Sequence, residues 1–378
     1  MMENNRRTFI KNSASLAVAL SVGKTALGRG TMGDFKPEKR QTEAAKDAGM
    51  QMCEAYFFGM EEQKIALTKQ MNVLGAVGGI NTSLAGSDAK PWEYKTIKAN
   101  VDAWTNVGLQ LRVIEGPPSL GEKTKLGLPG RDEEIANFIS FMKNLAKAGI
   151  DTICYNWMPV IGWSRTKNDK LGRGGALVTA FDYEVIRNAA YTPYGEVSKE
   201  KLWENLSYFL KAVVPEAEKA GVKLAMHPDD PQVDHIKGIS RIMTTVPNFD
   251  RLLQLYPSPN NGITMCQGNF SLMGADIPSV IEHFGKQGKI HFVHFRNVSG
   301  NKFKFEETFH DEGQIDMYKA MEAYYNIGFK GPIRPDHVPT MAGDSNAHPG
   351  YSTIGTLYAL GYMRGLMEAV SSRNYSHI

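Results

Sequence analysis

The sequence predicts an α/β protein with one (β/α)8 barrel domain, a TIM barrel, and a long loop insertion after the fourth strand. Three observations support this prediction. After Gly49, short apolar segments alternate with longer segments of helical periodicity, eight such units occur, and polar residues gather at several strand ends. Strands that alternate with helices pair in parallel, and eight of them close into a barrel. An open, doubly wound sheet is the alternative, which these observations favour less.

The eight predicted strands are short apolar runs. In chain order they are 50–58, 73–79, 109–116, 151–157, 222–228, 262–268, 289–297 and 331–337. Two of the segments between them, 131–149 and 198–221, have a clear helical pattern. Each has lysine near its end and finishes on glycine, which commonly terminates a helix. We therefore expect helices there that cross over between parallel strands.

The alternation is interrupted once, between the fourth and fifth strands. Residues 158–197 form a long connection that includes the Gly- and charge-rich string GWSRTKNDKLGRGGA. Connections of this length are usually functional or disordered. Active sites of barrel enzymes lie at the C-terminal ends of the strands, where this connection begins. We therefore expect a loop that covers the site as a lid.

Composition sets limits on the class of protein. The 378 residues fit one barrel domain with insertions, and 42% hydrophobic content allows a large core. The net charge is only +3 and no basic block stands out, so nucleic acid is not an expected partner. No apolar run reaches the roughly 18 residues of a membrane span, so no membrane is expected in the mature form. The three cysteines are too few and odd in number for a disulfide framework.

The N-terminus is predicted to be an export signal. Residues 1–42 are assigned to this leader and 43–378 to the barrel domain. Arg6 and Arg7 precede Phe9 and a mildly apolar stretch at 13–22, which resembles a twin-arginine signal. An amphipathic helix is the alternative. We expect export through the twin-arginine machinery to the periplasm, or a cytoplasmic protein if the leader is not functional.

Four consecutive strands end in residues that can bind a metal. They are His227, Cys266, His294 and Asp336. In a barrel these strand ends meet at one mouth, so the side chains are expected to converge. Each has a simpler interpretation on its own: a core histidine, an inert buried thiol or a loop cap. Four such residues at the same end of successive strands favour a metal site.

The predicted ligand set has its own chemistry. Two neutral imidazoles, a thiolate and a carboxylate neutralise a divalent ion. They suit Zn²⁺, Fe²⁺, Co²⁺ or Mn²⁺ better than Mg²⁺ or Ca²⁺. Strand alternation places Arg296 on the face of His294, and Arg334 on that of Asp336. Asp229 and Asp230 are expected to cap the turn that follows Pro228.

Over most of its length, from about Gly49 to Met367, the chain resembles the mannonate dehydratases, which are xylose-isomerase-like TIM barrels. The similar segments are 125–135, 144–166, 225–231, 290–298, 316–322, 334–337 and 349–355. The resemblance implies a lyase that removes water from D-mannonate to give 2-dehydro-3-deoxy-D-gluconate. It also implies a divalent metal cofactor, usually Mn²⁺ or Fe²⁺.

The resemblance assigns roles to individual residues. Its metal ligands fall on the four residues already identified, and its catalytic residues fall on His337 and Tyr351. We also expect Arg165, Arg296 and Asn297 to bind the sugar acid, since arginine suits planar, bidentate recognition. A solvated loop charge is the alternative for Arg165.

Two segments depart from the family pattern, 266–274 and 338–348, and both are expected near the site. Two other functions remain open: a related metal-dependent sugar isomerase or epimerase, and an exported protein that binds sugar acids without turnover. Isomerases and epimerases typically use carboxylate-rich sites, often with two metals, which Cys266 and the histidine pair disfavour. We further expect a homo-oligomer, in the simplest case a dimer.

Overall fold

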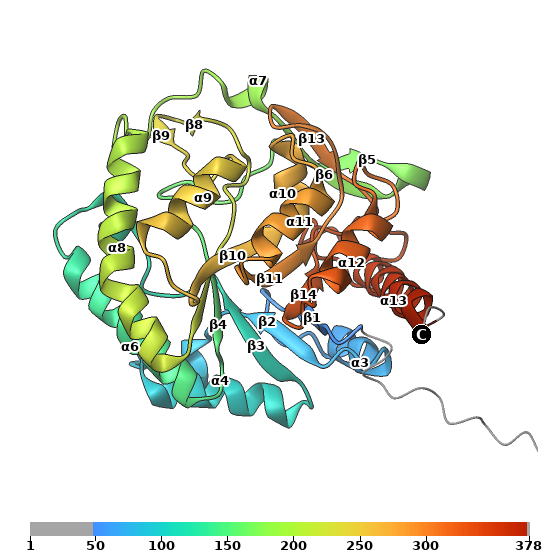
Figure 1. Ribbon diagram of the computed structural model, residues 1–378, viewed down its shortest axis with the longest axis horizontal. Helices are drawn as coiled ribbons and strands as arrows, with labels where there is room; N and C mark the ends of the chain where they lie inside the picture. The colour runs from blue at the N-terminus through green and yellow to red at the C-terminus, as the bar shows by residue number, and fades with distance from the viewer. Residues whose placement is uncertain (1–47, 376–378) are drawn as a thin grey trace, which may run out of the picture. The chain divides into compact units, whose positions relative to one another are not determined.

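The computed structural model describes residues 48–375, and the predicted leader at 1–42 lies outside them. All described residues belong to one compact unit. Eight parallel strands close into a barrel with the spatial order β1-β14-β11-β10-β7-β4-β3-β2 (Figure 1). Their bounds are β1 Gln51–Ala55, β2 Gly75–Gly78, β3 Gln110–Glu115, β4 Thr152–Tyr155, β7 Lys223–Met226, β10 Asn261–Cys266, β11 Ile290–Phe295 and β14 Pro332–Pro335. Each overlaps one predicted strand, so the barrel prediction is confirmed.

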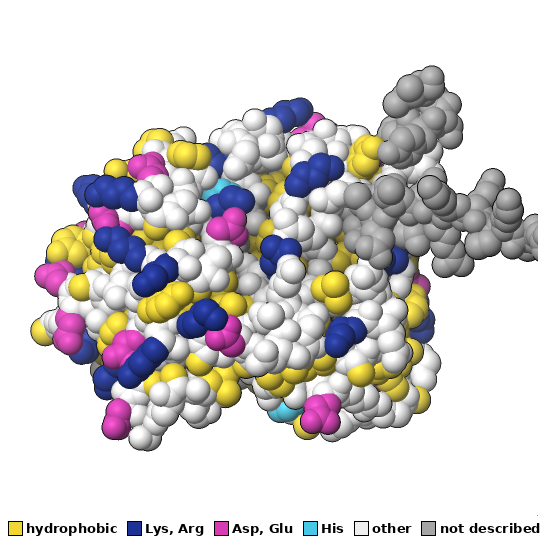
Figure 2. Space-filling view, turned by 90° about the horizontal axis from the view of Figure 1, so that it is seen from below, with side chains coloured by type: hydrophobic (Ala, Val, Ile, Leu, Met, Phe, Trp, Pro, Cys, Tyr) yellow, Lys and Arg dark blue, Asp and Glu magenta, His cyan; other side chains and the backbone are white. Residues whose placement is uncertain are grey.

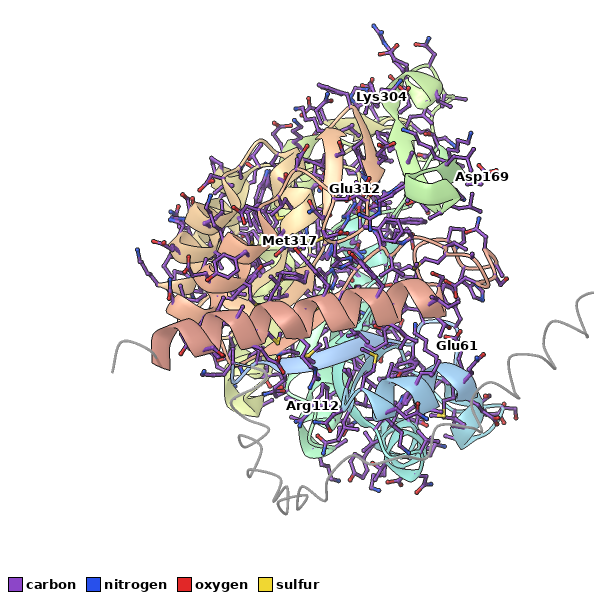
Figure 3. The ribbon with its side chains drawn as sticks, turned by 90° about the vertical axis from the view of Figure 1, so that its right-hand side faces the viewer. Glu61, Arg112, Asp169, Lys304, Glu312 and Met317 are labelled. Carbon is purple, nitrogen blue, oxygen red and sulfur yellow. The ribbon has the colours of Figure 1, made fainter. Side chains whose placement is uncertain are left out.

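Helices surround the barrel. The longer ones are α3 Glu62–Gln70, α4 Tyr94–Asn106, α6 Arg131–Lys147, α8 Lys199–Ala220, α9 Val246–Leu255, α11 Ile277–Gly285, α12 Met317–Asn326 and α13 Thr353–Tyr375. The shorter ones are α5 Glu122–Leu126, α7 Tyr183–Ile186, α10 Gln267–Leu272 and the 3-10 turns η1 Thr82–Ala85 and η2 Arg173–Gly175. The helices α6 and α8 confirm the two predicted from periodicity. Helix α13 lies beside β14 and α12 along one side of the barrel (Figure 3).

Local chemistry sets the ends of α8. The Ser198 side chain accepts a hydrogen bond from the Lys201 amide at the start. At the other end Gly221 adopts the left-handed conformation, φ 71°, which glycine reaches without steric cost. The buried face includes Trp203 and Phe209, and the Phe209 ring lies 5.2 Å from that of Phe138 on α6. Packing between helices therefore fixes the outer layer against the barrel.

The barrel interior has a small core of its own, formed by Cys53, Val77, Val113, Cys154, Ala225 and Phe292. All three cysteines are free and buried, as expected for a chain without a disulfide framework. Gly75 leaves room for this packing, since a Cβ there would lie 2.5 Å from the Cys53 sulfur. Two cysteines thus act as small core hydrophobes.

The connection after β4 is not only a loop. It contains β5 Lys167–Leu171 and β6 Leu177–Asp182, which join β12 Val298–Asn301 and β13 Lys304–Glu307 in an antiparallel sheet of order β12-β13-β6-β5. Figure 1 places this sheet above the barrel strands, and Figure 3 labels Asp169 and Lys304 within it. The sequence of β5, KNDKL, lacks apolar alternation, which is why the segment reads as a loop. A further two-stranded sheet pairs β8 His235–Ile236 with β9 Ile239–Ser240.

Charges of both signs are interspersed on the face shown in Figure 2, among apolar and uncharged side chains. Among the helices at 48–375, none combines the length and the hydrophobicity that a membrane crossing requires.

Candidate active site

Two cavities lie at opposite ends of the barrel. The larger, about 670 Å³, is lined by residues at the N-terminal ends of strands, such as Gln51 and Pro332. The smaller, about 140 Å³, lies at the C-terminal ends and is lined by both predicted metal-binding histidines. Barrel enzymes carry their active sites at this C-terminal end. The smaller cavity is therefore the candidate active site.

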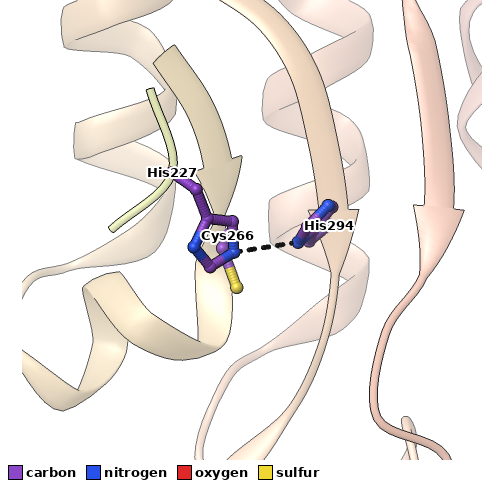
Figure 4. A group of neighbouring side chains, drawn as sticks. All are labelled: His227, Cys266 and His294. Carbon is purple, nitrogen blue, oxygen red and sulfur yellow. Dashed lines mark hydrogen bonds between the residues drawn. The ribbon is translucent and has the colours of Figure 1, made fainter. Parts of the chain in front are cut away.

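The structure brings the four predicted metal ligands together. His227 follows β7, Cys266 ends β10, His294 lies in β11 and Asp336 follows β14. One ligand atom from each of the first three lies within 4.8 Å of the others (Figure 4). The Asp336 Oδ2 atom is 3.6 Å from His294 Nδ1 and 3.8 Å from Cys266 Sγ.

Hydrogen bonding to the two imidazoles fits a bound cation. His227 Nδ1 lies 2.7 Å from the Pro228 carbonyl, so it carries a proton and Nε2 has a lone pair. His227 Nε2 lies 3.1 Å from His294 Nδ1, and the other His294 nitrogen faces a Glu115 oxygen at 3.4 Å. A proton on His294 Nε2 can be donated toward that carboxylate. The lone pairs on His227 Nε2 and His294 Nδ1 then face each other. A divalent ion held by these two nitrogens would relieve this repulsion.

Glu115 supports the ligands from β3. Its carboxylate accepts hydrogen bonds from Arg334 at 2.9, 3.1 and 3.2 Å, and Arg334 also donates to Asp336 at 2.8 Å. Burial alone would raise the pKa of Glu115, but the charge of Arg334 and the hydrogen bond from His294 lower it to about 2. An ionised carboxylate next to a metal-binding histidine orients the ring. The signal in the sequence was a glutamate at the end of a predicted strand, 109–116.

Glu115, Cys154 and His294 form a second group of possible ligands. This group fits a cation less well, because Arg334 already neutralises Glu115. Burial raises the pKa of the Cys154 thiol well above its usual range, which disfavours the thiolate. The group with Cys266 is therefore the better candidate for the metal centre.

A buried network of ion pairs lies beside the candidate metal centre. Arg165 Nη1 donates to Asp230 at 2.6 Å and its Nη2 donates to Glu307 at 2.7 Å. Arg296 donates to the same two carboxylates, at 2.9 Å to Asp230 and 2.8 Å to Glu307. All four side chains are at most 1% exposed. Two positive and two negative charges balance one another away from solvent.

This network excludes one alternative and corrects one expectation. Arg165 is not a solvated loop charge, because its guanidinium is buried between two carboxylates. Asp230 does not cap a turn, since both arginines bind it. Asp229 instead accepts a hydrogen bond from the distant Met243 amide at 2.8 Å. Turn chemistry suggested caps, whereas tertiary pairing determines both roles.

The three residues expected to bind the sugar acid do not line the cavity. Arg165 and Arg296 are engaged by the network, and Arg296 Nη1 also lies 3.6 Å from the Cys266 sulfur. Asn297 donates to the His310 carbonyl at 3.1 Å and accepts from the Ile315 amide at 3.0 Å. Its amide therefore fixes the backbone around it.

His337 and Tyr351 both line the cavity, with ring centroids 5.6 Å apart. Burial, and then the Asp336 carboxylate, raise the pKa of Tyr351 well above its usual range, so the phenol stays protonated. Trp163 covers His337, with ring centroids 5.4 Å apart, and Arg165 stacks on Trp163 at 4.7 Å. The insertion after β4 therefore forms part of the cavity wall, as expected of a covering segment.

Replacing Arg165 with methionine is expected to destabilise the fold by about 3–5 kcal/mol, because it leaves two buried carboxylates short of a partner. Arg173→Met is the matched control. Arg173 lies on the same insertion and pairs with Asp311, but its side chain is 41% exposed, so a loss of about 0–1 kcal/mol is expected. Urea unfolding measures both, and equal losses would contradict a structural role for the buried network.

Fold and site together define a metal-dependent (β/α)8 barrel enzyme whose candidate centre has two histidines, a cysteine and an aspartate at the C-terminal mouth. A family model described as D-mannonate dehydratase (UxuA) matches residues 50–192 and 186–377. The chain belongs to this family.

Curated relatives and solved structures agree with this assignment. The chain is 37% identical to mannonate dehydratase 2 of Halalkalibacterium halodurans, over 85% of this chain and 100% of that protein. It is 36% identical to the mannonate dehydratase of Thermotoga neapolitana, over 83% of this chain and 96% of that protein. The crystal structure of mannonate dehydratase from Streptococcus suis serotype 2 is 32% identical, with a TM-score of 0.77 over 86% of this chain and 95% of that one. A D-tagatose 3-epimerase-like protein, 14% identical with a TM-score of 0.56 over 86% of this chain and 99% of that one, shares the fold.

Proposed function

We propose that the chain is a hydro-lyase that dehydrates D-mannonate to 2-dehydro-3-deoxy-D-gluconate. The observation that carries this proposal is the convergence of His227, Cys266, His294 and Asp336 beside a histidine and a tyrosine in one cavity. Membership in the D-mannonate dehydratase family supports the same reaction.

We further propose that the four ligands hold Mn²⁺ or Fe²⁺. A single thiolate among nitrogen and oxygen ligands suits such ions better than Mg²⁺. Bound there, the ion would stabilise the negative charge that develops on the carboxylate of the sugar acid. His227 and His294 would bind it as neutral rings, and the charges of Cys266 and Asp336 would balance the cation.

The protein groups supply the proton transfers. Dehydration requires loss of the C2 proton, which is weakly acidic, and protonation of the departing C3 hydroxyl. His337 and Tyr351 are the proposed acid–base pair, since both line the cavity and neither belongs to the proposed ligand set. Trp163 lines the same cavity and packs against His337.

An assay of the purified chain with a panel of hexonates and metals tests this function. D-Mannonate with Mn²⁺ or Fe²⁺ is expected to give the highest kcat/KM and a 2-keto-3-deoxy product, and chelation is expected to abolish turnover. An isomeric sugar formed without loss of water would support an isomerase or epimerase instead. Binding without any product would support a sugar-acid-binding protein.

Export and assembly stay predictions from the sequence. The paired Arg6 and Arg7 lie outside the described residues, so the twin-arginine route to the periplasm is a proposal and a cytoplasmic location remains compatible. Cell fractionation with N-terminal sequencing tests it, and an uncleaved cytoplasmic chain would contradict it. Light scattering tests the proposed dimer.

A further inference from the structure

A glutamate from outside the barrel reaches the candidate active site. Glu307 ends β13, in the antiparallel sheet that joins the insertions after β4 and β11. Its side chain is 1% exposed, and its Oε1 atom lies 3.1 Å from His337 Nδ1. Nothing in the strand pattern of the sequence marks this residue, because its partners lie 11 to 142 residues away.

The contacts around His337 Nδ1 determine where its proton sits. Arg165 Nη2 is also near, at 3.5 Å, but it has only two hydrogens. Asp230 Oδ2 accepts one at 3.0 Å and Glu307 Oε1 accepts the other at 2.7 Å. No Arg165 hydrogen remains for His337, so the imidazole nitrogen must be the donor to the Glu307 carboxylate.

We propose that Glu307 is a positioning residue that keeps a proton on His337 Nδ1 and thereby makes Nε2 the nitrogen that exchanges a proton with the sugar acid. The inference rests on the proposed function, in which His337 is half of the acid–base pair. The arrangement follows a general rule: a carboxylate behind one imidazole nitrogen sets the tautomer and the ring orientation.

Two further observations support a role for Glu307 in positioning the His337 ring. Its backbone has φ 50°, a conformation that non-glycine residues rarely adopt, so its ring position requires support from neighbours. The carboxylate is also kept ionised. Burial would raise the pKa of Glu307, but the charges of Arg296 and Arg165, together with the hydrogen bond from His337, lower it to about 2.

The tautomer can be read on the unaltered protein. Nitrogen-15 spectra of histidine-labelled, Zn²⁺-loaded protein would contain nine histidines, and the His337→Asn variant identifies the signal of interest. We expect protonated Nδ1 and unprotonated Nε2 at His337. The reverse pattern would overturn the proposal without reference to activity.

Kinetics of Glu307→Gln test the consequence. We expect kcat per metal-loaded chain to fall by about 100-fold or more, with KM for D-mannonate changed by less than about threefold. Glu306→Gln is the matched control, because Glu306 points to the other face of β13 and pairs with Lys170; it is expected to retain wild-type kcat. A purely structural role would instead lower the metal-loaded, folded fraction and leave kcat per loaded chain intact, which overturns the proposal.

The outcomes separate this inference from the function on which it rests. If the wild-type chain converts D-mannonate, His337→Asn does not, and Glu307→Gln keeps wild-type kcat, the positioning role is wrong and the proposed function stands. If the metal-loaded wild-type chain converts no D-mannonate, the proposed function and the positioning role of Glu307 are both wrong.

Discussion

Replacing Cys266 with serine is expected to remove the metal and the activity together. The thiolate is one of only two anionic ligands, so a neutral hydroxyl leaves the cation under-compensated. Substitutions behind a ligand already weaken metal binding about 10–100-fold, and loss of the ligand itself is expected to exceed about 100-fold. Metal per chain after dialysis, measured by mass spectrometry, and turnover of D-mannonate check this.

The matched control is Cys154→Ser, because Cys154 belongs to the second group of possible ligands around His294. If the metal occupies the site that contains Cys266, the Cys154 variant retains its metal. Loss of metal from Cys154→Ser, with full retention in Cys266→Ser, would place the ion between Glu115 and Cys154 instead.

Replacing His337 with asparagine is expected to separate chemistry from metal binding. The variant should keep one metal per chain, because the imidazole is not one of the four ligands, and should lose about 10²–10⁴-fold in kcat, the usual contribution of a general acid or base. Asparagine is the suitable substitute, since it tolerates the positive φ of 50° at this position. Metal analysis and steady-state kinetics measure both properties.

Two results would contradict this role for His337. Wild-type turnover in the variant would show that the reaction does not use the imidazole. Loss of metal with loss of turnover would show that the residue supports the metal centre, and Tyr351→Phe would then be the remaining test of the acid–base pair.

The barrel and the proposed ligands could be predicted because their signals repeat. Each strand is a short apolar run, and His227, Cys266, His294 and Asp336 occupy the same end of four successive strands. The closed topology converts this position in the sequence into proximity in space. Periodicity and fold rules therefore account for the strands and for the convergence of the candidate metal centre.

The buried ion pairs could not be predicted in the same way. Arg165 and Glu307 are 142 residues apart, and neither lies on a barrel strand. A charged residue in a connection is usually solvated, and only tertiary pairing buries it. The same reason explains Asp230, whose position after Pro228 suggested a turn cap, whereas both arginines bind it.

The pairing of β6 with β13 has a consequence for how such a site can be altered. The insertion after β4 and the segment that contains β13 lie more than one hundred residues apart, yet together they form one cover beside the active site. The insertion contributes Trp163 and Arg165, and the β13 segment contributes Glu307. Shortening either one exposes the hydrogen-bonding edge of the other. A functional cover can therefore be transferred between relatives, in evolution or by engineering, only if both segments are transferred together.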